Sequence, residues 1–450
     1  MGELGPQGLL IAAPASGSGK TFLTLAILRA LRRQGRAVSS IKVGPDYIDP
    51  AFHRAASGRD CFNLDGWAMS SDTLAGIVGQ AGSDSDLIIG EGVMGLFDGA
   101  VGGGGSTADL SVLTGWPVIL VVPAAGMGAS VAALVEGFQH HRADLSIAGL
   151  IFNGIGGERH ESLLRNACAG LDVPVIGAIP KQENLRLPSR HLGLVQAGEH
   201  AELESFLEAA ASHVTGHMDL AALAALAEPS RLCATEAVTP PAFVLGQRTA
   251  VARDQAFAFA YPHLLSAWRA AGVEVSFFSP LADEAPATGC DSVFLPGGYP
   301  ELHGGRLAAN KRYQAGLRRA ADRGSVVYGE CGGYMALGEG LIDGEGCRHT
   351  MAGLLPLETS FAAPSRRLGY RQARLLTDGP LGSQGRSFLG HEFHYAVELD
   401  QRSAFGSNGT SPLFAISDAG GTALPEAGQR VGPVMGSFLH LIDGQGTAAS

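Results

Sequence analysis

The chain has 450 residues, of which 46% are hydrophobic and 17% are charged. This length predicts about two to four domains, and the hydrophobic content excludes disorder over most of the sequence. The net charge of −11 argues against a general nucleic-acid binder or a membrane-surface protein. We therefore expect small-molecule partners, with no nucleic acid and no membrane among them.

The cysteines and the N-terminus indicate where the chain resides. Six cysteines are widely spaced and none forms a C-x-x-C pair, which disfavours zinc or a disulfide framework and favours a reducing compartment. The N-terminus lacks a signal-peptide pattern. The uncharged stretch Pro117 to Val135 approaches the length of a membrane span, but it reads as a strand, a small-residue loop and a helix start. We expect a cytoplasmic protein, and a homodimer stays open.

The first half of the chain alternates apolar strands with amphipathic helices. A helix is expected over Thr21–Arg33, with its apolar residues on one face. The expected strands are Leu9–Ala13, Ala37–Val43, Asp86–Glu91, Val118–Val122, Ile147–Asn153 and Val175–Ile179. Uninterrupted apolar strands alternating with helices indicate a parallel sheet that is covered on both faces.

The segment of about 214 to 242 interrupts this pattern with an Ala/Leu-rich helix (Leu220–Ala227) and three prolines. The pattern then restarts, with a helix at Tyr261–Ala271 and more β structure from about 350 to 440. The expected strands here are Thr249–Arg253, Glu274–Phe278, Ser292–Leu295 and Ser325–Tyr328. We therefore expect two α/β domains, over residues 1–235 and 245–450.

The first candidate site is a phosphate-binding loop between a strand and a helix, in LLIAAPASGSGKT at residues 9–21. Glycines let backbone N–H groups turn toward phosphate oxygens, and the helix N-terminus adds a favourable dipole. Lys20 would reach the β- and γ-phosphates of ATP, and Thr21 would bind Mg²⁺. Pro14 replaces the first Gly of the usual motif, so an ordinary glycine-rich turn is the alternative. The residues assigned to ATP here are Gly17, Ser18, Gly19, Lys20 and Thr21.

Carboxylates follow two further strands of the first half. Asp46 and Asp49 lie in the stiff loop KVGPDYIDP, and Glu91 ends a third strand. Because the carboxyl ends of parallel strands form one edge, Thr21, Asp46 and Glu91 are expected to share one Mg²⁺ with phosphate oxygens. A loop-capping role is the alternative for each acid.

Asn153 ends another strand at the same expected edge. Its side-chain amide has the donor and the acceptor needed to read the adenine edge of ATP. An Asx turn is the equally weighted alternative.

The second candidate site is a cysteine at a sharp turn between a strand and a helix. Cys331 lies between Gly329 and Gly333 in YGECGGYM, which has the form of a nucleophile elbow. The helix N-terminus is expected to lower the thiol pKa, and the Gly332 N–H is expected to stabilise an oxyanion. A buried structural thiol is the alternative.

Two distant segments complete this expected site. Gly298, in FLPGGYPE, is expected to add a second oxyanion-hole N–H, and His440, in GSFLHLI, is the candidate base, with a structural histidine as the alternative. His391 and His394 do not predict a metal site, because their spacing on a strand places them on opposite faces.

These motifs together resemble the a,c-diamide synthases of corrinoid (cobalamin) biosynthesis. The resemblance covers nearly the whole chain and is carried by these stretches: Ala13–Thr21, Lys42–Phe52, Glu91–Asp98, Ser106–Leu110, Leu295–Glu301, Tyr328–Leu337, Leu368–Arg371, Gly390–Tyr395 and Gly436–Leu441. It implies an N-terminal domain similar to the dethiobiotin-synthetase-like ATP-binding fold. It also implies a C-terminal domain similar to class I glutamine amidotransferases.

The resemblance further implies that glutamine-derived ammonia amidates two acetate carboxylates of the macrocycle after their activation by Mg-ATP. It implies macrocycle contacts for Tyr47, Asp49, Leu64, Asp65, Ser106 and Asp109. The wider amidotransferase class usually has Glu two residues after the catalytic His; this chain has Ile442, as is typical of the corrinoid branch. Cobyric acid synthase, a sirohydrochlorin-type substrate and a P-loop switch ATPase with a scaffold amidotransferase domain are the alternatives.

Overall fold

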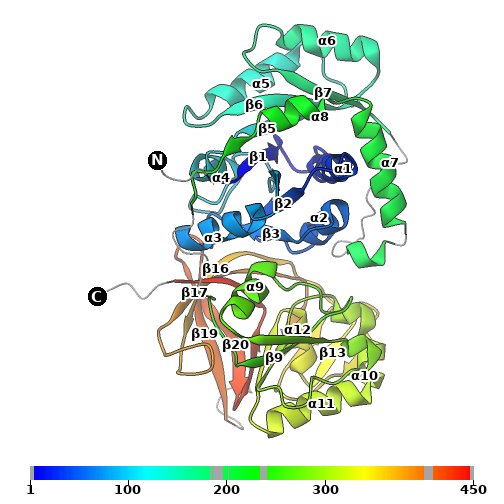
Figure 1. Cartoon of the computed structure of the whole chain (residues 1–450). Coiled ribbons are helices and arrows are strands. Elements are labelled where there is room, and N and C mark those ends of the chain that lie inside the picture. Colours follow the sequence, from blue (N-terminus) through cyan, green and yellow to red (C-terminus); the bar gives the residue numbers. More distant parts are fainter. Residues whose placement is uncertain are drawn as a thin grey trace. The chain divides into compact units, whose positions relative to one another are not determined.

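The chain divides into two compact units, residues 1–239 and 240–450 (Figure 1). The computed structural model describes residues 5–182, 185, 196–200, 202–233, 241–399 and 409–445. The segment of about 214 to 242, expected as a linker or domain edge, forms helix α8 (Leu220–Ala225) and strand β8 (Glu228–Pro229) of the N-terminal unit, and its residues 234–240 lie outside the described residues. Both units are α/β, which confirms the expected fold class.

A parallel sheet forms the centre of the N-terminal unit. Its strands run in the order β3-β2-β4-β1-β5-β6-β7, and β8 pairs antiparallel with β1. Their bounds are β1 Gln7–Ala12, β2 Val38–Val43, β3 Cys61–Leu64, β4 Leu87–Glu91, β5 Val118–Pro123, β6 Ile147–Ile155, β7 Val175–Pro180 and β8 Glu228–Pro229. Strands β2 and β4 are buried at every residue, because helices cover both faces of a parallel sheet.

The helices of this unit lie on both faces of the sheet, with α1, α2 and α7 on one side and α3 and α4 on the other (Figure 1). Their bounds are α1 Lys20–Arg33, α2 Asp49–Ser57, α3 Ser71–Gly82, α4 Thr107–Thr114, α5 Ser130–His140, α6 Glu158–Cys168, α7 Leu203–Thr215 and α8 Leu220–Ala225, with a short 3₁₀ turn η1 at Ala197–Glu199. Helix α1 packs against α7 and α2. No helix of the described residues is long and apolar enough to cross a bilayer.

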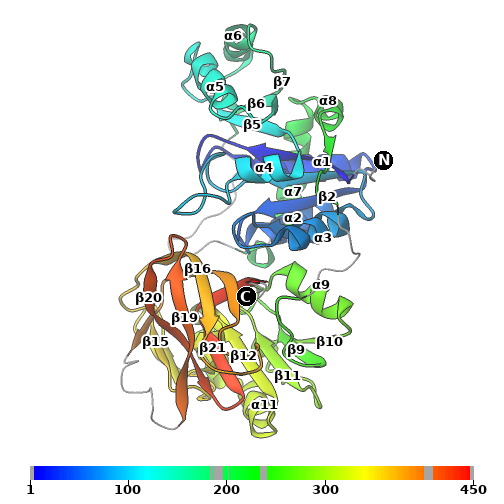
Figure 2. The same cartoon turned by 90° about the vertical axis from the view of Figure 1, so that its left-hand side faces the viewer.

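The C-terminal unit is built on a ten-stranded sheet that is parallel at one end and antiparallel at the other. The order is β10-β9-β11-β12-β21-β20-β19-β16-β17-β22. The bounds are β9 Arg248–Ala252, β10 Glu274–Phe278, β11 Ser292–Leu295, β12 Val326–Glu330, β16 Arg367–Leu375, β17 Ser387–His394, β19 Thr410–Asp418, β20 Ala423–Val431, β21 Val434–Ser437 and β22 Leu439–Gln445. The β-rich character expected for 350–440 is confirmed. In Figure 2 the long strands β16, β19 and β20 lie apart from the β9–β11 end of the sheet.

Smaller elements complete this unit. A second sheet has the order β14-β13-β15-β18. The remaining bounds are β13 Gly340–Ile342, β14 Arg348–Thr350, β15 Glu358–Ser360, β18 Val397–Leu399, α9 Pro262–Ala270, α10 Gly304–Ala309, α11 Lys311–Asp322, α12 Gly332–Leu337, η2 Pro280–Ala282 and η3 Pro300–His303. Strands β21 and β22 are separated only by Phe438, where the chain leaves β12 and joins β17. This switch brings the start of β22 beside the end of β12.

Candidate functional site

The loop between β1 and α1 has the backbone that an anion-binding turn requires. Gly17 and Gly19 have backbone φ angles of 78° and 92°, which residues with a Cβ atom rarely adopt. The Lys20 ammonium donates hydrogen bonds to the Ala15 carbonyl at 3.3 Å and the Met94 carbonyl at 2.5 Å. These two backbone carbonyls therefore fix the position of the Lys20 ammonium at the loop.

Asn153 braces this loop from the neighbouring strand β6. Its amide nitrogen donates to the Ser18 carbonyl at 2.9 Å, and a Cβ added to Gly19 would lie 2.2 Å from that nitrogen. The glycine thus permits a close approach of the amide to the loop. The expected contact of Asn153 with adenine stays a prediction.

A buried cluster of charges follows the loop. Thr21 Oγ1 lies 2.5 Å from Glu91 Oε1 and 3.5 Å from Asp49 Oδ2. The Lys42 ammonium lies between the same carboxylates, 2.6 Å from Asp49 and 2.7 Å from Glu91. Burial alone would raise the pKa of Glu91, but the Lys42 charge and a hydrogen bond with His53 hold it well below its usual range. Burial and the Asp46 charge raise the pKa of Asp49 to about 6.

His53 supports Glu91 from the interior. Its Nε2 lies 2.6 Å from Glu91 Oε2, and its Nδ1 lies 3.5 Å from Cys61 Sγ. Neither His53 nor Lys42 was predicted from the sequence as a site residue. A lysine within the apolar strand VSSIKV was a usable signal, because a buried lysine needs an anionic partner.

Of the predicted magnesium ligands, Thr21 and Glu91 lie together with Asp49, which was expected at the macrocycle instead, whereas Asp46 lies apart from them. Thr21, Glu91 and Asp49 bring a hydroxyl and two carboxylates together, and such hard oxygen donors suit Mg²⁺. Asp46 instead caps the start of α2, where its Oδ1 accepts the N–H groups of Ile48 and Asp49 at 2.8 and 3.1 Å. The three acids and the Thr21 hydroxyl line one cavity of about 980 Å³ with the loop. No cluster of three or more His, Cys, Asp or Glu suited to a metal ion occurs among the described residues.

Most residues expected to contact a macrocycle have structural contacts of their own. Leu64 and Asp65 are fully buried, so neither presents surface to a substrate here; Asp65 Oδ1 accepts two N–H groups of the following turn. Ser106 and Asp109 form the capping box of α4, and Asp109 pairs with Arg142 at 2.6 Å. Tyr47 is half-buried, and Asp49 belongs to the charge cluster described above. The expected substrate contacts stay predictions.

Cys331 occupies a strained turn in the second unit. Its φ is 49° and its ψ is −108°, a conformation that costs about 1–3 kcal/mol and persists where surrounding packing enforces it. Glycines permit this packing, since a Cβ on Gly333 would lie 1.9 Å from the Leu295 carbonyl oxygen. The Cys331 N–H donates to the Ser437 carbonyl at 2.8 Å, which ties the turn to β21.

The two glycines expected to form the oxyanion hole lie against each other. A Cβ on Gly332 would lie 2.8 Å from the Gly298 nitrogen. The backbones that carry the two N–H groups are therefore neighbours beside Cys331. Their action on an oxyanion stays a prediction.

The pKa of Cys331 is shifted in the opposite direction to the expected one. Burial, followed by the negative charge of Glu301, raises the pKa of the thiol to about 12, against a lowering contribution from the Gly332 N–H. The expectation of a thiolate stabilised by the helix N-terminus is therefore wrong for this structure. The N-terminus of a six-residue helix stabilises the thiolate by less free energy than desolvation of the thiolate costs.

His440 and Cys331 both lie against Gly297, and the role of His440 as the base stays a prediction. A Cβ on Gly297 would lie 3.0 Å from His440 Nε2 and 3.2 Å from Cys331 Cβ, so both residues contact the same glycine. Burial, followed by the charges of His391 and His394, lowers the pKa of His440 to about 3. The resting pair is a neutral thiol and a neutral imidazole.

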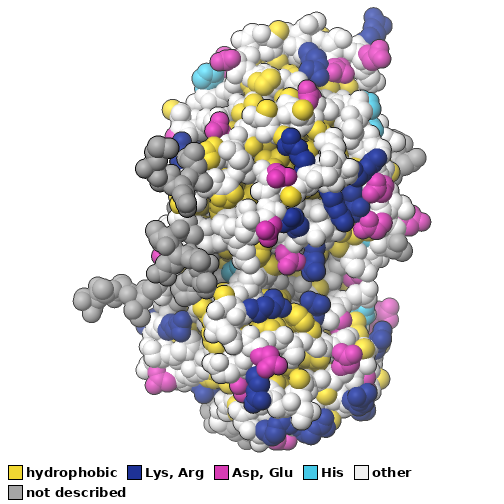
Figure 3. Space-filling view, viewed as in Figure 1, with side chains coloured by type: hydrophobic (Ala, Val, Ile, Leu, Met, Phe, Trp, Pro, Cys, Tyr) yellow, Lys and Arg dark blue, Asp and Glu magenta, His cyan; other side chains and the backbone are white. Residues whose placement is uncertain are grey.

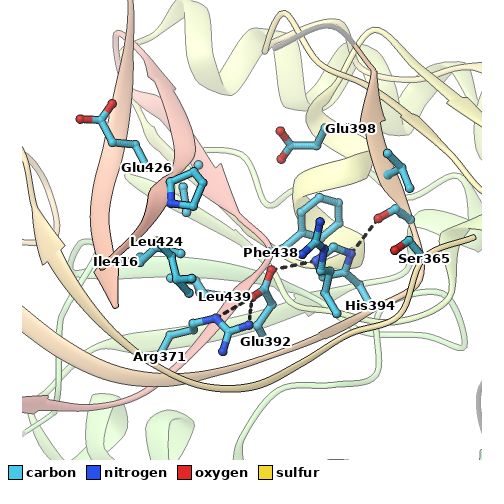
Figure 4. Close-up of a pocket in the computed structure, with 16 residues that line it drawn as sticks. Ser365, Arg371, Glu392, His394, Glu398, Ile416, Leu424, Glu426, Phe438 and Leu439 are labelled. Atoms are coloured by element: carbon cyan, nitrogen blue, oxygen red, sulfur yellow. Dashed lines mark hydrogen bonds and ion pairs between the residues drawn. The ribbon is translucent and has the colours of Figure 1, made fainter. Parts of the chain in front are cut away.

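The strand next to His440 borders a second cavity, of about 640 Å³ (Figure 4). Glu392 pairs there with Arg371 at 2.7 Å and with His394 Nε2 at 2.9 Å. The His394 ring stacks on Phe438 at 3.8 Å. His394 is thus a support for the turn that precedes His440.

Comparison with known proteins identifies both units. Residues 9–195 match the family described as the CobQ/CobB/MinD/ParA nucleotide binding domain, and residues 248–447 match the CobB/CobQ-like glutamine amidotransferase domain. The hydrogenobyrinate a,c-diamide synthase of Brucella anthropi is 54% identical over 439 residues, covering 97% of this chain and 98% of that protein. The chain belongs to the hydrogenobyrinate a,c-diamide synthase family.

Other members of this family match over the same length. The enzyme of that name from Rhizobium meliloti is 52% identical over 441 residues, covering 97% of this chain and 99% of that protein. The one from Rhodobacter capsulatus is 51% identical over 445 residues, covering 98% and 99%. The resemblance drawn from the sequence motifs is confirmed. The chain is an amidating ligase with a nucleotide-binding domain and a glutamine amidotransferase domain.

Proposed function

We propose that the chain amidates the a and c acetate carboxylates of hydrogenobyrinic acid in cobalamin biosynthesis, with ATP and glutamine as co-substrates. The observation that carries this proposal is the pairing of Cys331 and His440 around Gly297 in a chain that is 54% identical to a named a,c-diamide synthase. Two amidations replace two hydroxyls by two amino groups. The absence of disulfides among the cysteines, all of which the structure describes, supports a reducing cytoplasm as the compartment.

Cys331 and His440 would release ammonia from glutamine. As Sγ attacks the side-chain carbonyl carbon, the thiol proton passes to His440 Nε2, and the oxyanion is met by the N–H groups of Gly332 and Gly298. The C–N bond breaks, Nε2 gives its proton to the leaving nitrogen, and ammonia departs. Water then hydrolyses the thioester to glutamate. Because the resting thiol is neutral, the proton must move during the attack rather than before it.

The N-terminal unit would activate the substrate carboxylate. Lys20 and the turned N–H groups of its loop would bind the ATP phosphates, and a macrocycle carboxylate would attack the γ-phosphate to give an acyl phosphate and ADP. Ammonia then displaces phosphate and forms the amide. Thr21, Asp49 and Glu91 would hold Mg²⁺, with Asp46 fixing the loop. The ion, when bound, offsets negative charge on the phosphates.

Product mass tests this function. The chain is incubated with Mg-ATP, glutamine and either metal-free hydrogenobyrinic acid or cobalt-bearing cobyrinic acid, beside Cys331→Ala with glutamine or free ammonia. We expect a diamide from metal-free substrate, and rescue of Cys331→Ala by ammonia alone. If a diamide formed only from the cobalt-bearing form, the substrate would be cobyrinic acid instead of hydrogenobyrinic acid. Amidation of other side chains would favour a cobyric acid synthase activity.

A switch ATPase is the alternative of a different class. It predicts ATP hydrolysis without glutamine, no mass change on either macrocycle, and indifference to Cys331→Ala. The strained elbow, with φ of 49° at Cys331, favours the amidotransferase. Backbone strain of this kind is concentrated at active sites, and a scaffold domain would not require it.

A further inference from the structure

The strand that carries His440 has one acidic residue, Asp443, three positions further along the chain. Ile442, two residues further on, is 1% exposed and its carbonyl accepts from His263 Nε2 at 2.9 Å. Asp443 accepts the Gly444 N–H at 2.8 Å, and its charge acts on His263. A carboxyl group also approaches the imidazole from another element, β12.

Glu330, the last residue of β12 and the neighbour of Cys331, lies near the Nδ1 atom of the His440 imidazole. Its side chain is 1% exposed, and Oε2 lies 3.9 Å from His440 Nδ1. Oε1 accepts the Leu441 N–H and the Tyr328 hydroxyl, each at 3.1 Å. Two hydrogen-bond donors and the imidazole thus converge on one buried carboxyl group.

We propose that Glu330 is the residue that positions His440, completing a Cys–His–Glu arrangement in which the acid comes from the nucleophile's own strand. This inference rests on the proposed glutamine hydrolysis at Cys331. Glu330 touches neither glutamine nor the reacting atoms, so it is a positioning residue.

The geometry gives the two imidazole nitrogens separate tasks. The Cε1–Nε2 edge of the ring lies against Gly297, which Cys331 also contacts, whereas Nδ1 lies 3.9 Å from Glu330 Oε2. A carboxyl oxygen that accepts Nδ1–H leaves Nε2 unprotonated, which is the tautomer that can take the thiol proton. The contact of 3.9 Å is longer than a hydrogen bond, and such contacts commonly tighten when substrate binds.

Glu330 also holds the strand on which His440 lies. The Leu441 N–H that it accepts belongs to the residue directly after His440. One side chain therefore fixes both the backbone of β22 and the tautomer of the ring. His391, the cross-strand partner of His440, is an imidazole and offers no carboxylate in its place.

Glutamine hydrolysis without macrocycle tests this inference, so that a failure of the macrocycle reaction leaves the test intact. For Glu330→Gln we expect kcat to fall about 100-fold or more, the size of a lost acid–base contribution, with KM for glutamine within about threefold. Glu330→Asp should restore part of kcat. Amidation with free ammonia should persist in both variants.

Glu398→Gln is the control, because Glu398 is a half-buried acid of the same unit whose charge acts on another tyrosine, Tyr334. It should leave glutamine hydrolysis near the wild-type value. A folded Glu330→Gln with wild-type kcat overturns the proposal, as does an equal loss in Glu398→Gln. If Glu330→Gln fails to fold, Glu330→Asp decides: wild-type kcat overturns the proposal, and a lowered kcat at constant KM supports it.

Discussion

Gly297 lies so close to His440 that a Cβ on the glycine would be 2.3 Å from the imidazole Cε1. No side chain larger than hydrogen fits between the strand end and the ring without displacing one of them. The spacing of Cys331 and His440 therefore depends on the absence of a methyl group.

Gly297→Ala should abolish most glutamine-dependent amidation while ammonia-dependent amidation continues, because the methyl group pushes His440 away from the thiol. A displacement of about 1 Å can cost roughly 100-fold in rate. Gly344→Ala is the control, since nothing lies within 4 Å of a Cβ at that position. Equal glutamine-dependent rates in the two variants would contradict this prediction.

Lys42→Met should destabilise the N-terminal unit by about 3–5 kcal/mol, because it leaves Asp49 and Glu91 buried without their shared cation. Thermal unfolding measures the loss. Mg²⁺ should raise the melting temperature of the variant more than that of wild type, because the ion can replace the ammonium between the carboxylates. Lys311→Met, at an exposed position in the other unit, should change neither quantity. An equal Mg²⁺ response in all three proteins would argue against an ion at this cluster.

Cys331 should react slowly with iodoacetamide in the absence of glutamine. Its pKa of about 12 against an ordinary value of 9.0 makes the thiolate fraction about a thousandfold smaller at neutral pH. The exposed Cys347 of the same unit is the internal standard, and peptide mass spectrometry compares the two rates. Labelling of Cys331 as fast as Cys347 would show that the thiol is ionised at rest.

The charge state of Glu330 makes a separate prediction about stability. Burial raises its pKa to about 8 from an ordinary value of 4.5. The folded state therefore binds the proton more tightly, so the stability from this group is complete below pH 4.5 and is lost as pH rises through 8. The slope is about 1.4 kcal/mol per pH unit.

Glu330→Gln removes this titration. The free energy of unfolding of the variant, relative to wild type, should therefore rise with pH between 4.5 and 8. Urea unfolding at about pH 5 and about pH 8 measures this difference. A difference that is constant with pH would mean that Glu330 titrates at an ordinary pKa.

Local sequence determined much of the fold and of each candidate site. The strand at Val118–Pro123 and the helix at Lys20–Arg33 formed where apolar runs and periodicity placed them, because both features depend on neighbours in the chain. The loop Gly17–Thr21 and the elbow at Cys331 were recognisable for the same reason: each requires particular residues at fixed spacing around one turn. The strand Cys61–Leu64 was missed, since four residues carry too little periodicity to distinguish it from a loop.

Tertiary structure alone decided which distant groups meet and what charge they carry. Lys42 is paired with Glu91 only because β2 and β4 are neighbours in the sheet, and Glu330 reaches His440 only because the chain turns at Phe438. The thiol pKa of Cys331 rose where the sequence predicted a fall, because desolvation depends on every element packed around the turn. Spacing along the chain identifies chemical groups, whereas burial and cross-strand contact, which are set by the whole fold, determine their protonation and their partners.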